Sequence, residues 1–181
     1  MKSRDEILTR QLQRGDRGAQ KELYDLHSAT LMAIAVRYLG DRDQAEDLLH
    51  DTFIKIFASV NKFKYRGEGS LKAWMSRIMV NAALERIKSR GKERFVSLDL
   101  VPLEAEEPPS VEQVPQRVLL EFIAELPAGY RTVFNLFCIE GYSHRQIAEE
   151  LGINEKSSSS QLLRAKRLLM TKIKKYIEVN G

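Results

Sequence analysis

The chain has 181 residues, of which 43% are hydrophobic and 30% are charged, and its formal net charge is +4. This length and composition suit a water-soluble protein of one or two small domains, each with a hydrophobic core. No run of about eighteen apolar residues could cross a membrane, and no apolar stretch follows the charged N-terminus as in a secretory signal. Cys138 is the only cysteine, which excludes an intrachain disulfide, so we expect a cytoplasmic protein with no membrane insertion.

The charge is unevenly distributed along the chain. Residues 1–90 have a net charge of +5, residues 91–115 have −4 and residues 116–181 have +3. Two basic blocks that flank an acidic segment are typical of a protein that contacts nucleic acid at two places. Two mildly basic domains joined by a solubilising linker would have the same distribution, and charge does not separate these interpretations.

Helical periodicity dominates residues 1–90, where helices are predicted over 5–14, 19–39, 42–60 and 71–90. Gly40 ends the second helix, Asp41 caps the third, and Ser70 is placed to cap the fourth. Apolar residues at helical spacing are assigned to the core: Leu23, Leu26, Leu31, Ile34, Ala35, Tyr38, Ala45, Leu48, Leu49, Thr52, Phe53, Ile56, Phe57, Val60, Leu71, Met75, Ile78, Met79 and Ala82.

The face of helix 42–60 that lies opposite this core is acidic. A turn of about 100° per residue groups these side chains: Asp43, Asp47, His50, Asp51, Ile54 and Ala58. Carboxylates around an exposed isoleucine would repel DNA, so this face is predicted to dock on a basic partner helix.

A metal site is the alternative for the same helix, because Asp47 and His50 have the carboxylate-x-x-His spacing of di-iron bundles. Such a site needs a matching motif on another helix. Neither His27 nor His144 has a carboxylate three residues before it. We therefore expect no metal ion or other cofactor, and we interpret His50 as a polar surface residue.

The segment 61–69 is predicted to be a loop in which basic and aromatic side chains alternate, NKFKYRGEG. Cations neutralise phosphates while rings stack on bases, so this pattern suits single-stranded nucleic acid. Gly67 and Gly69 allow the backbone to approach a ligand closely. A phosphate loop is excluded, because a third glycine, a preceding strand and the Lys-Ser/Thr pair are missing.

One edge of helix 71–90 carries Trp74, Arg77, Asn81 and Lys88, which recur at helical spacing. An aromatic ring, an amide and two cations in a row form a plausible surface for melted DNA. Core packing fits Trp74 as well as base stacking does, and a simple surface role fits Asn81 as well as base recognition.

Residues 91–116 contain two Val-Pro pairs, a Pro-Pro pair and a run of acidic residues. Such a segment cannot form a core and is predicted to be a flexible, acidic linker. The fold class is therefore all-α, with an N-terminal helical domain (1–92), a linker (93–115) and a C-terminal helical domain (116–181).

The C-terminal domain ends in two helices that meet at a sharp turn. Ser143 and Gln146 have capping-box spacing, Gly152 can end the first helix in the left-handed conformation, and Asn154 caps the second. Helices are also predicted over 117–126 and 130–140, with Cys138 buried. The inward stripe of the last helix is Leu162, Ala165, Leu168 and Leu169, and Arg167 faces outward with the site residues given below.

Two helices joined in this way are typical of a helix-turn-helix, whose second helix enters the DNA major groove. An ordinary helical hairpin with a solvated basic face also fits this stretch alone.

Three ordered segments resemble the extracytoplasmic-function (ECF) subfamily of bacterial RNA polymerase sigma factors, over about residues 15–176. They are GDRDQAEDLLHDTFIKIF, then FKYRGEGSLKAWMSRIMVNAALERIKSR, then LPAGYRTVFNLFCIEGYSHRQIAEELGI followed by SQLLRAKRLL. The resemblance implies a non-enzymatic protein that binds core RNA polymerase and promoter DNA and is held inactive by an anti-sigma factor. We expect a monomer when it is free.

The resemblance also implies roles for particular residues. The face with Asp43, Asp47, His50, Asp51 and Ile54 would dock on the clamp helices of the polymerase's largest subunit, and the polymerase flap would be a further contact. The residues implied to open the minus-ten element and capture a flipped base are Lys64, Arg66, Gly67, Ser70, Lys72, Trp74, Arg77, Asn81 and Lys88. The linker would thread through the polymerase cleft.

In the C-terminal domain the resemblance implies recognition of the minus-thirty-five element by Lys156, Ser157, Ser159, Ser160, Leu163 and Arg164. Arg131, His144 and Arg145 would contact phosphates. Many relatives have Arg or Lys where this chain has Ser159, and serine cannot make the bidentate contact to guanine that arginine makes.

Two other classes of protein are alternatives to a sigma factor: a stand-alone regulator and an enzyme. A self-sufficient helix-turn-helix regulator needs a ligand pocket or a dimer interface, and neither is visible in the sequence. An enzyme needs a nucleophile-base pair, a metal cluster or a phosphate loop, and none can be assembled from these residues.

Overall fold

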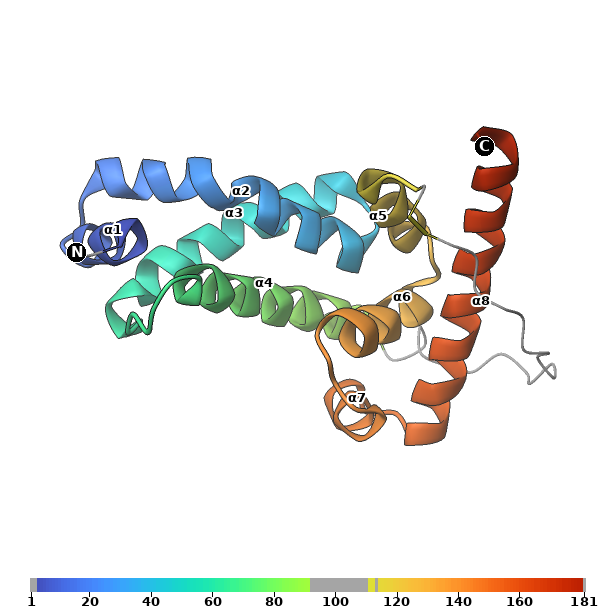
Figure 1. Cartoon of the computed structure of the whole chain (residues 1–181). Helices are drawn as coiled ribbons and strands as arrows, with labels where there is room; N and C mark the ends of the chain where they lie inside the picture. The colour runs from blue at the N-terminus through green and yellow to red at the C-terminus, as the bar shows by residue number, and fades with distance from the viewer. Residues whose placement is uncertain (1–2, 92–110, 113, 181) are drawn as a thin grey trace. The chain divides into compact units, whose positions relative to one another are not determined.

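The computed structural model describes residues 3–91, 111–112 and 114–180 (Figure 1). Within these ranges all regular structure is helical and no strand is present, which confirms the all-α prediction. The chain divides into unit 1, Met1–Arg86, and unit 2, Ile87–Gly181, each with its own core. Most of the acidic linker predicted over 93–115 lies outside the described residues.

Unit 1 consists of α1 (Arg4–Gln13), α2 (Arg17–Leu39), α3 (Arg42–Ser59), the short η1 (Val60–Lys62) and α4 (Ser70–Ser89) up to Arg86, where the division between the units falls. α2 packs against α1 and α3, and α1 also packs against η1. α3 contacts α4 in the core, where the Thr52 hydroxyl lies 3.7 Å from the Met79 sulfur. Fully buried side chains include Leu8, Leu23, Leu31, Tyr38, Ile56, Leu71, Met75, Met79 and Leu84.

The joint between α2 and α3 follows the sequence prediction. Gly40 adopts a left-handed φ of 71° at the end of α2, and its N–H donates to the Val36 carbonyl. The Asp41 carboxylate accepts a 2.9 Å hydrogen bond from the Gln44 N–H at the start of α3. The two caps fix the direction in which α3 leaves α2, and hence which of its faces is buried.

Unit 2 contains α5 (Gln116–Ala124), α6 (Ala128–Phe134), the π-helical stretch η3 (Asn135–Ile139), α7 (His144–Leu151) and α8 (Glu155–Asn180). α8 packs against α5, α6 and α7 and organises the unit. One cluster of its core comprises Val114, Val118, Ile123, Leu126, Ala165, Leu169 and Ile173.

The helix-turn-helix geometry predicted for α7 and α8 is present. The Gln146 N–H donates to the Ser143 hydroxyl at 3.2 Å, and the Ser143 N–H donates to the Gln146 side chain at 2.9 Å, which completes the capping box. Gly152 has a φ of 66°, and the Asn154 side chain accepts from the Ser157 N–H at 2.7 Å. These local bonds set the turn between the helices.

Some packing predictions are wrong. Leu26 and Leu168 were assigned to cores, but 44% and 39% of their respective surfaces are exposed, because both lie at the edge of their helical stripes. Cys138 is exposed and not buried. The atoms around it still raise the pKa of its thiol by desolvation, and Lys166 opposes this shift.

Ser70 does not cap α4 from the preceding position, as predicted, but is its first residue. Its hydroxyl donates to the Gly67 carbonyl at 2.6 Å and accepts from the Arg66 N–H at 3.2 Å. The side chain therefore closes the preceding loop. Among the described helices, none combines the length and apolar character needed to cross a membrane.

Candidate nucleic-acid and docking sites

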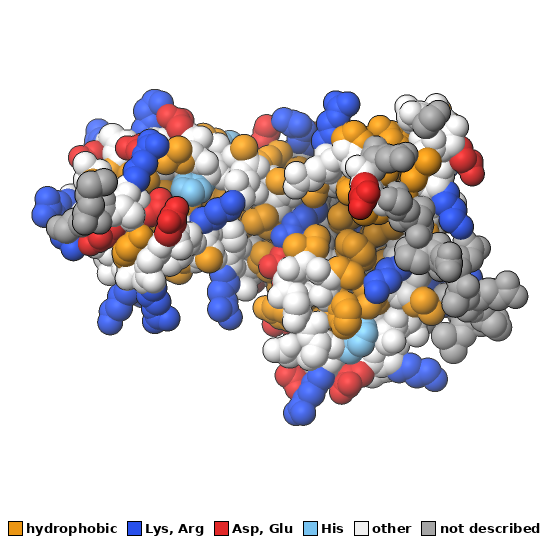
Figure 2. All heavy atoms as spheres, viewed as in Figure 1, with side chains coloured by type: hydrophobic (Ala, Val, Ile, Leu, Met, Phe, Trp, Pro, Cys, Tyr) orange, Lys and Arg blue, Asp and Glu red, His pale blue; other side chains and the backbone are white. Residues whose placement is uncertain are grey.

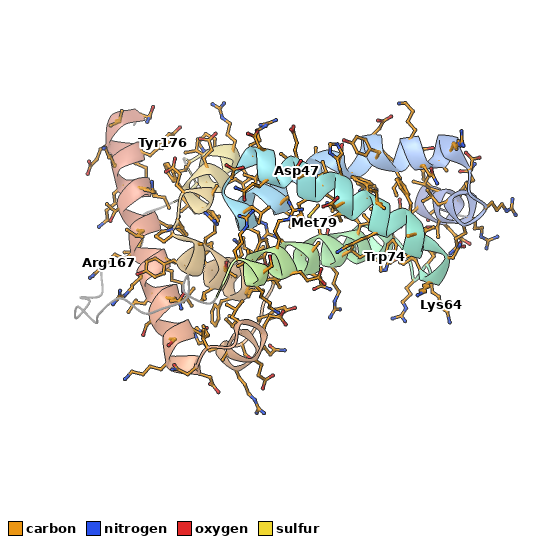
Figure 3. The ribbon with its side chains drawn as sticks, turned by 180° about the vertical axis from the view of Figure 1, so that it is seen from behind. Asp47, Lys64, Trp74, Met79, Arg167 and Tyr176 are labelled. Atoms are coloured by element: carbon orange, nitrogen blue, oxygen red, sulfur yellow. The ribbon has the colours of Figure 1, made fainter. Side chains whose placement is uncertain are left out.

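The outward face of α3 is exposed as predicted, because the opposite face fills the core of unit 1. Asp43, Asp47, His50 and Asp51 are all exposed, and Ile54 has 68% of its surface accessible. Figure 3 labels Asp47 on this helix. We call the set of Asp43, Asp47, His50, Asp51 and Ile54 the acidic face.

Asp51 differs from the rest of the acidic face, because it has an ion-pair partner within unit 1. The Arg86 guanidinium lies 2.9 Å from the Asp51 carboxylate and also donates to the Gln44 carbonyl at 3.2 Å. Part of the Asp51 charge is therefore neutralised by the fold, which leaves Asp43 and Asp47 as the stronger candidates for attracting a basic partner.

A pocket of about 400 Å³ lies between the loop and α4. Its lining residues are Lys62, Phe63, Lys64, Arg66, Ser70, Ala73, Trp74 and Arg77, and we call it the loop pocket. Gly67 and Gly69 have φ values of 116° and 79°, which residues with side chains rarely adopt. Together with the Ser70 bonds to Arg66 and Gly67, they give the loop a fixed shape.

The position of Trp74 is compatible with both roles expected for it, core packing and base stacking. Its ring lies 4.9 Å from the buried Phe63 ring, tilted by 33°, which supports the indole from within. The side chain is only half-buried and also lines the loop pocket. Figure 3 shows Trp74 and Lys64 at the same end of unit 1. The structure thus presents an aromatic wall beside a basic loop, as base stacking requires.

The cations predicted around this pocket are exposed, but they do not all line it. Lys64, Arg66 and Arg77 do, and basic side chains project from this end of unit 1 in Figure 2. Lys72 is exposed outside the lining and acts electrostatically on His27. Asn81 and Lys88 are exposed further along α4.

The start of α8 presents the residues predicted for the major groove. Lys156, Ser159 and Leu163 are exposed, whereas Ser157, Ser160 and Arg164 are half-buried. The Arg164 guanidinium is oriented by a 3.3 Å hydrogen bond to the Tyr130 hydroxyl. Arg145 on α7 is exposed and pairs with Glu149 at 3.2 Å. These groups lie on the two helices that a helix-turn-helix brings to DNA.

Arg131, predicted to contact a phosphate, is instead a buried structural residue. Only 9% of its surface is accessible, and its guanidinium donates to the carbonyls of Ala124 at 2.6 Å and Leu126 at 3.0 Å. A cation at the C-terminal end of α5 satisfies carbonyls that the helix itself leaves unpaired. The prediction that Arg131 contacts a phosphate is therefore wrong, because its guanidinium is buried and bonded within unit 2.

His144 has an internal role that its sequence position did not indicate. Its ring stacks on Phe137 with centroids 4.5 Å apart, and its Nδ1 lies 2.9 Å from the hydroxyl of the fully buried Ser158. Ser158 was not singled out from the serine run. It lies four and seven residues before Leu162 and Ala165, and this helical spacing could have assigned it to the core side.

The metal site considered as an alternative for Asp47 and His50 on α3 has no further ligands among the described residues. Within the described residues, no group of three His, Cys, Asp or Glu side chains could hold a metal ion.

Comparisons with known proteins identify the class. Residues 23–93 match the family model of sigma-70 region 2, and residues 116–169 match the model of sigma-70 region 4. Both regions belong to the sigma-70 class of DNA-binding transcription initiation factors, and they occur in the order predicted from the sequence.

Curated relatives narrow this class. The ECF RNA polymerase sigma factor SigL of Mycobacterium tuberculosis is 31% identical over 152 residues, which are 82% of this chain and 85% of SigL. The ECF sigma factor SigE of Mycolicibacterium smegmatis is 30% identical over 174 residues, which are 90% of this chain but only 65% of SigE. The chain belongs to the ECF sigma factor family.

A solved structure is also similar, the sigma factor RpoE in complex with the anti-sigma factor NepR from Bartonella quintana. It is 25% identical, covers 89% of this chain and 98% of that chain, and has a TM-score of 0.46.

Proposed function

We propose that this protein binds core RNA polymerase and directs it to promoters by recognising minus-ten and minus-thirty-five elements and helping to melt the DNA. The observation that carries the proposal is the loop pocket, where Trp74 forms an aromatic wall beside Lys64, Arg66 and Arg77. A helix-turn-helix alone would serve a repressor equally well. A basic, aromatic pocket in a separate helical unit suits a melted strand, which a repressor does not need.

At the minus-ten element, the proposed event is capture of an unstacked base. Extruding a base costs a few kcal/mol of lost stacking and pairing, and stacking on an aromatic side chain returns about 1–3 kcal/mol. Trp74 supplies the stacking surface, and the loop cations neutralise the neighbouring phosphates. Asn81, Lys72 and Lys88 would extend the contact along α4.

At the minus-thirty-five element, α8 would enter the major groove. Lys156, Ser159 and Leu163 are exposed there, with Ser157, Ser160 and Arg164 beside them. Arg145 is the proposed phosphate contact on α7, and His144 would approach the backbone from its stacked position. Ser159 cannot make the bidentate hydrogen bond that an arginine makes to guanine, so base discrimination would depend more on Arg164 and Lys156.

Docking on polymerase is assigned to the acidic face of α3, with the clamp helices of the largest subunit as its partner and the flap as a further contact. Charge complementarity supports this choice, because carboxylates around an exposed isoleucine favour a basic helix over DNA. Each DNA-binding unit alone has few phosphate contacts and should bind weakly at physiological salt. Holding both units on one polymerase makes the second contact intramolecular.

The remaining partners follow from the same proposal. RpoE is captured with an anti-sigma factor, and we propose that an anti-sigma factor also controls this chain, which would be a monomer in the cytoplasm when free. The acidic linker would thread through the polymerase cleft. No enzymatic activity is proposed.

The first test is transcription by purified components. Adding the protein to core polymerase on a library of promoter fragments should yield transcripts from a defined subset, and the protein without polymerase should bind those fragments poorly. A stand-alone regulator would bind tightly without polymerase and add no transcripts. That outcome would replace the sigma-factor proposal with the regulator.

The second test addresses docking. The double variant Asp43→Lys and Asp47→Lys should lose co-purification with core polymerase while its melting temperature stays unchanged, since both side chains are exposed. Asp25→Lys is the matched control, because Asp25 is an exposed aspartate on α2 whose partner is Lys21. Unchanged co-purification of the double variant would remove the docking role from α3. Asp51 is tested separately, because its reversal also breaks the Arg86 pair.

A further inference from the structure

Arg86 on α4 covers one carboxylate of the acidic face of α3. Figure 3 shows the two helices side by side, with Asp47 labelled on α3. One terminal nitrogen of the Arg86 guanidinium lies 2.9 Å from the Asp51 carboxylate, and the other donates to the Gln44 carbonyl at 3.2 Å. Both acceptors belong to α3 and lie about two helical turns apart. Two bonds therefore hold the planar guanidinium against α3 in one orientation.

The ion pair between Asp51 and Arg86 is exposed enough for another cation to compete for it. The Asp51 side chain has 58% of its surface accessible, and that of Arg86 has 26%. A carboxylate accepts several hydrogen bonds, so Asp51 can receive a second donor before the first one leaves. Exposed ion pairs add little to stability, because water and salt screen them. A cation of a partner can therefore displace Arg86 from Asp51 at small cost to the fold.

A second ion pair joins the same two helices, and it has the opposite polarity. The Lys55 Nζ on α3 lies 3.2 Å from the Glu85 carboxylate on α4, and both side chains are more than half exposed. Lys55 is not a member of the acidic face. Of these two pairs, the one made by Arg86 neutralises a carboxylate of that face, and the one made by Lys55 does not. The effect of Arg86 on docking can therefore be separated from the linking of α3 to α4.

We propose that Arg86 lowers the affinity of the acidic face for core polymerase. In the free protein it neutralises Asp51, and a cation of the basic partner helix must displace it before Asp51 can join the contact. Arg86 also places a positive charge beside a surface that receives a basic helix, and like charges across an interface repel each other. Affinity is thus reduced without a change in the shape of the docking surface. This inference rests on the proposed docking of α3 on polymerase.

The experiment measures the dissociation constant of the full chain for core polymerase, by titrating polymerase into fluorescently labelled protein. Arg86→Gln removes the charge and keeps an amide that can donate to the Gln44 carbonyl, and Arg86→Met removes the charge and keeps an apolar stem. Lys55→Gln is the matched control, because it removes one positive charge from the same two helices and breaks the other ion pair. The double variant Arg86→Gln and Asp51→Asn tests whether any gain requires the Asp51 carboxylate.

We expect Arg86→Gln and Arg86→Met to bind core polymerase about threefold to fivefold more tightly than wild type, the scale of one exposed ion pair. A loss of stability would weaken binding, so it cannot produce this gain. Lys55→Gln should stay within about twofold of wild type, because charges away from the contact are screened at physiological salt. The double variant Arg86→Gln and Asp51→Asn should lose the gain, since the uncovered carboxylate is missing.

The outcomes separate this inference from the proposed docking. If the double variant Asp43→Lys and Asp47→Lys binds polymerase like wild type, α3 is not the docking surface and the role of Arg86 fails with it. If that variant loses binding but neither Arg86→Gln nor Arg86→Met binds more tightly than wild type, docking stands and the inference about Arg86 is overturned. An equal gain in Lys55→Gln, or a gain that persists without the Asp51 carboxylate, would show a general effect of charge and would also overturn it.

Discussion

The loop of unit 1 and the helix-turn-helix of unit 2 both carry predicted DNA contacts, but they differ in what the fold requires of those residues. In the loop, the cations Lys64 and Arg66 are exposed, and the backbone is held by Ser70 and two glycines. In unit 2, Arg131 and His144 are used to assemble the domain itself. A basic residue beside a DNA-binding motif is therefore not always available to DNA.

The difference has a structural cause. A loop supported by left-handed glycines and backbone hydrogen bonds needs no cation to hold its shape. In unit 2, α5 ends at Ala124 shortly before α6 begins at Ala128, and the Arg131 guanidinium on α6 donates to the carbonyls of Ala124 and Leu126 at this helix end. Arg131 is therefore held by the fold at a helix end, whereas the loop cations Lys64 and Arg66 are exposed.

The largest effect is expected for the two arginines that were both predicted to contact phosphates. Arg131→Ala should destabilise unit 2 by about 3 kcal/mol, because it leaves the buried Leu126 carbonyl and the partly buried Ala124 carbonyl without their donor. Arg145→Ala should change stability by less than about 0.5 kcal/mol, since its ion pair with Glu149 is exposed. Calorimetry of the full chain measures both.

For DNA binding, we expect the larger effect from Arg145→Ala and not from Arg131→Ala. Arg145→Ala should weaken promoter binding by the holoenzyme and lower the magnitude of the salt slope by about one. If Arg131→Ala folds with wild-type stability and shows this salt effect instead, Arg131 is a phosphate contact after all, and the distinction between the two regions is lost.

The next effect concerns Trp74 in unit 1. Trp74→Ala should destabilise this unit by about 2 kcal/mol, less than the roughly 3–5 kcal/mol of a fully buried aromatic residue, because the indole is half-buried. Trp74→Phe should recover most of the stability through the contact with Phe63. Permanganate footprinting measures promoter opening, which should fall strongly for Trp74→Ala. Normal opening by this variant would assign Trp74 to packing alone.

A smaller effect separates two neighbouring serines of α8. Ser158→Ala should cost about 1 kcal/mol in thermal unfolding, because it removes the partner of the His144 Nδ1. Ser159→Ala should leave stability unchanged, because this side chain is exposed, and should alter only the preference for the minus-thirty-five sequence. Equal stability of the two variants would contradict the internal role of Ser158.

Local structure was largely predictable from the sequence. The Ser143 capping box, the left-handed Gly152 and the Asp41 cap depend on a few adjacent residues, and all are present. The exposure of the acidic face also followed from the periodicity of α3. Such features need no knowledge of what packs on the helix.

Tertiary contacts were less predictable. Burial of Arg131 depends on where α5 ends relative to α6. Exposure of Leu26 and Leu168 depends on how much of the apolar face of each helix is covered by its neighbours. The loop pocket depends on how the loop folds against α4. The assignments of Lys156, Ser157, Ser160 and Leu163 to base contacts remain predictions.

The smallest expected effect is a pH dependence confined to unit 1. His27 on α2 is half-buried, and within the described structure its Nε2 is buried without a hydrogen-bond partner. Burial lowers the pKa of its imidazole, which Asp5 opposes and Lys72 reinforces. The folded state therefore favours neutral His27, while the unfolded state takes up a proton near the ordinary pKa of about 6.5. Stability should be full above this pH and should decrease as pH falls through 6.5 toward the lower folded-state pKa.

Trp74 is the only tryptophan of the chain and belongs to unit 1, so its fluorescence isolates this transition from that of unit 2. Urea denaturation followed in this way should have a lower midpoint at pH 5.5 than at pH 7.5. His27→Gln should reduce the difference, because the side chain no longer titrates, whereas His50→Gln on the exposed acidic face should keep it. An identical pH difference in wild type and His27→Gln would show that burial of His27 is not the cause and that another group of unit 1 is.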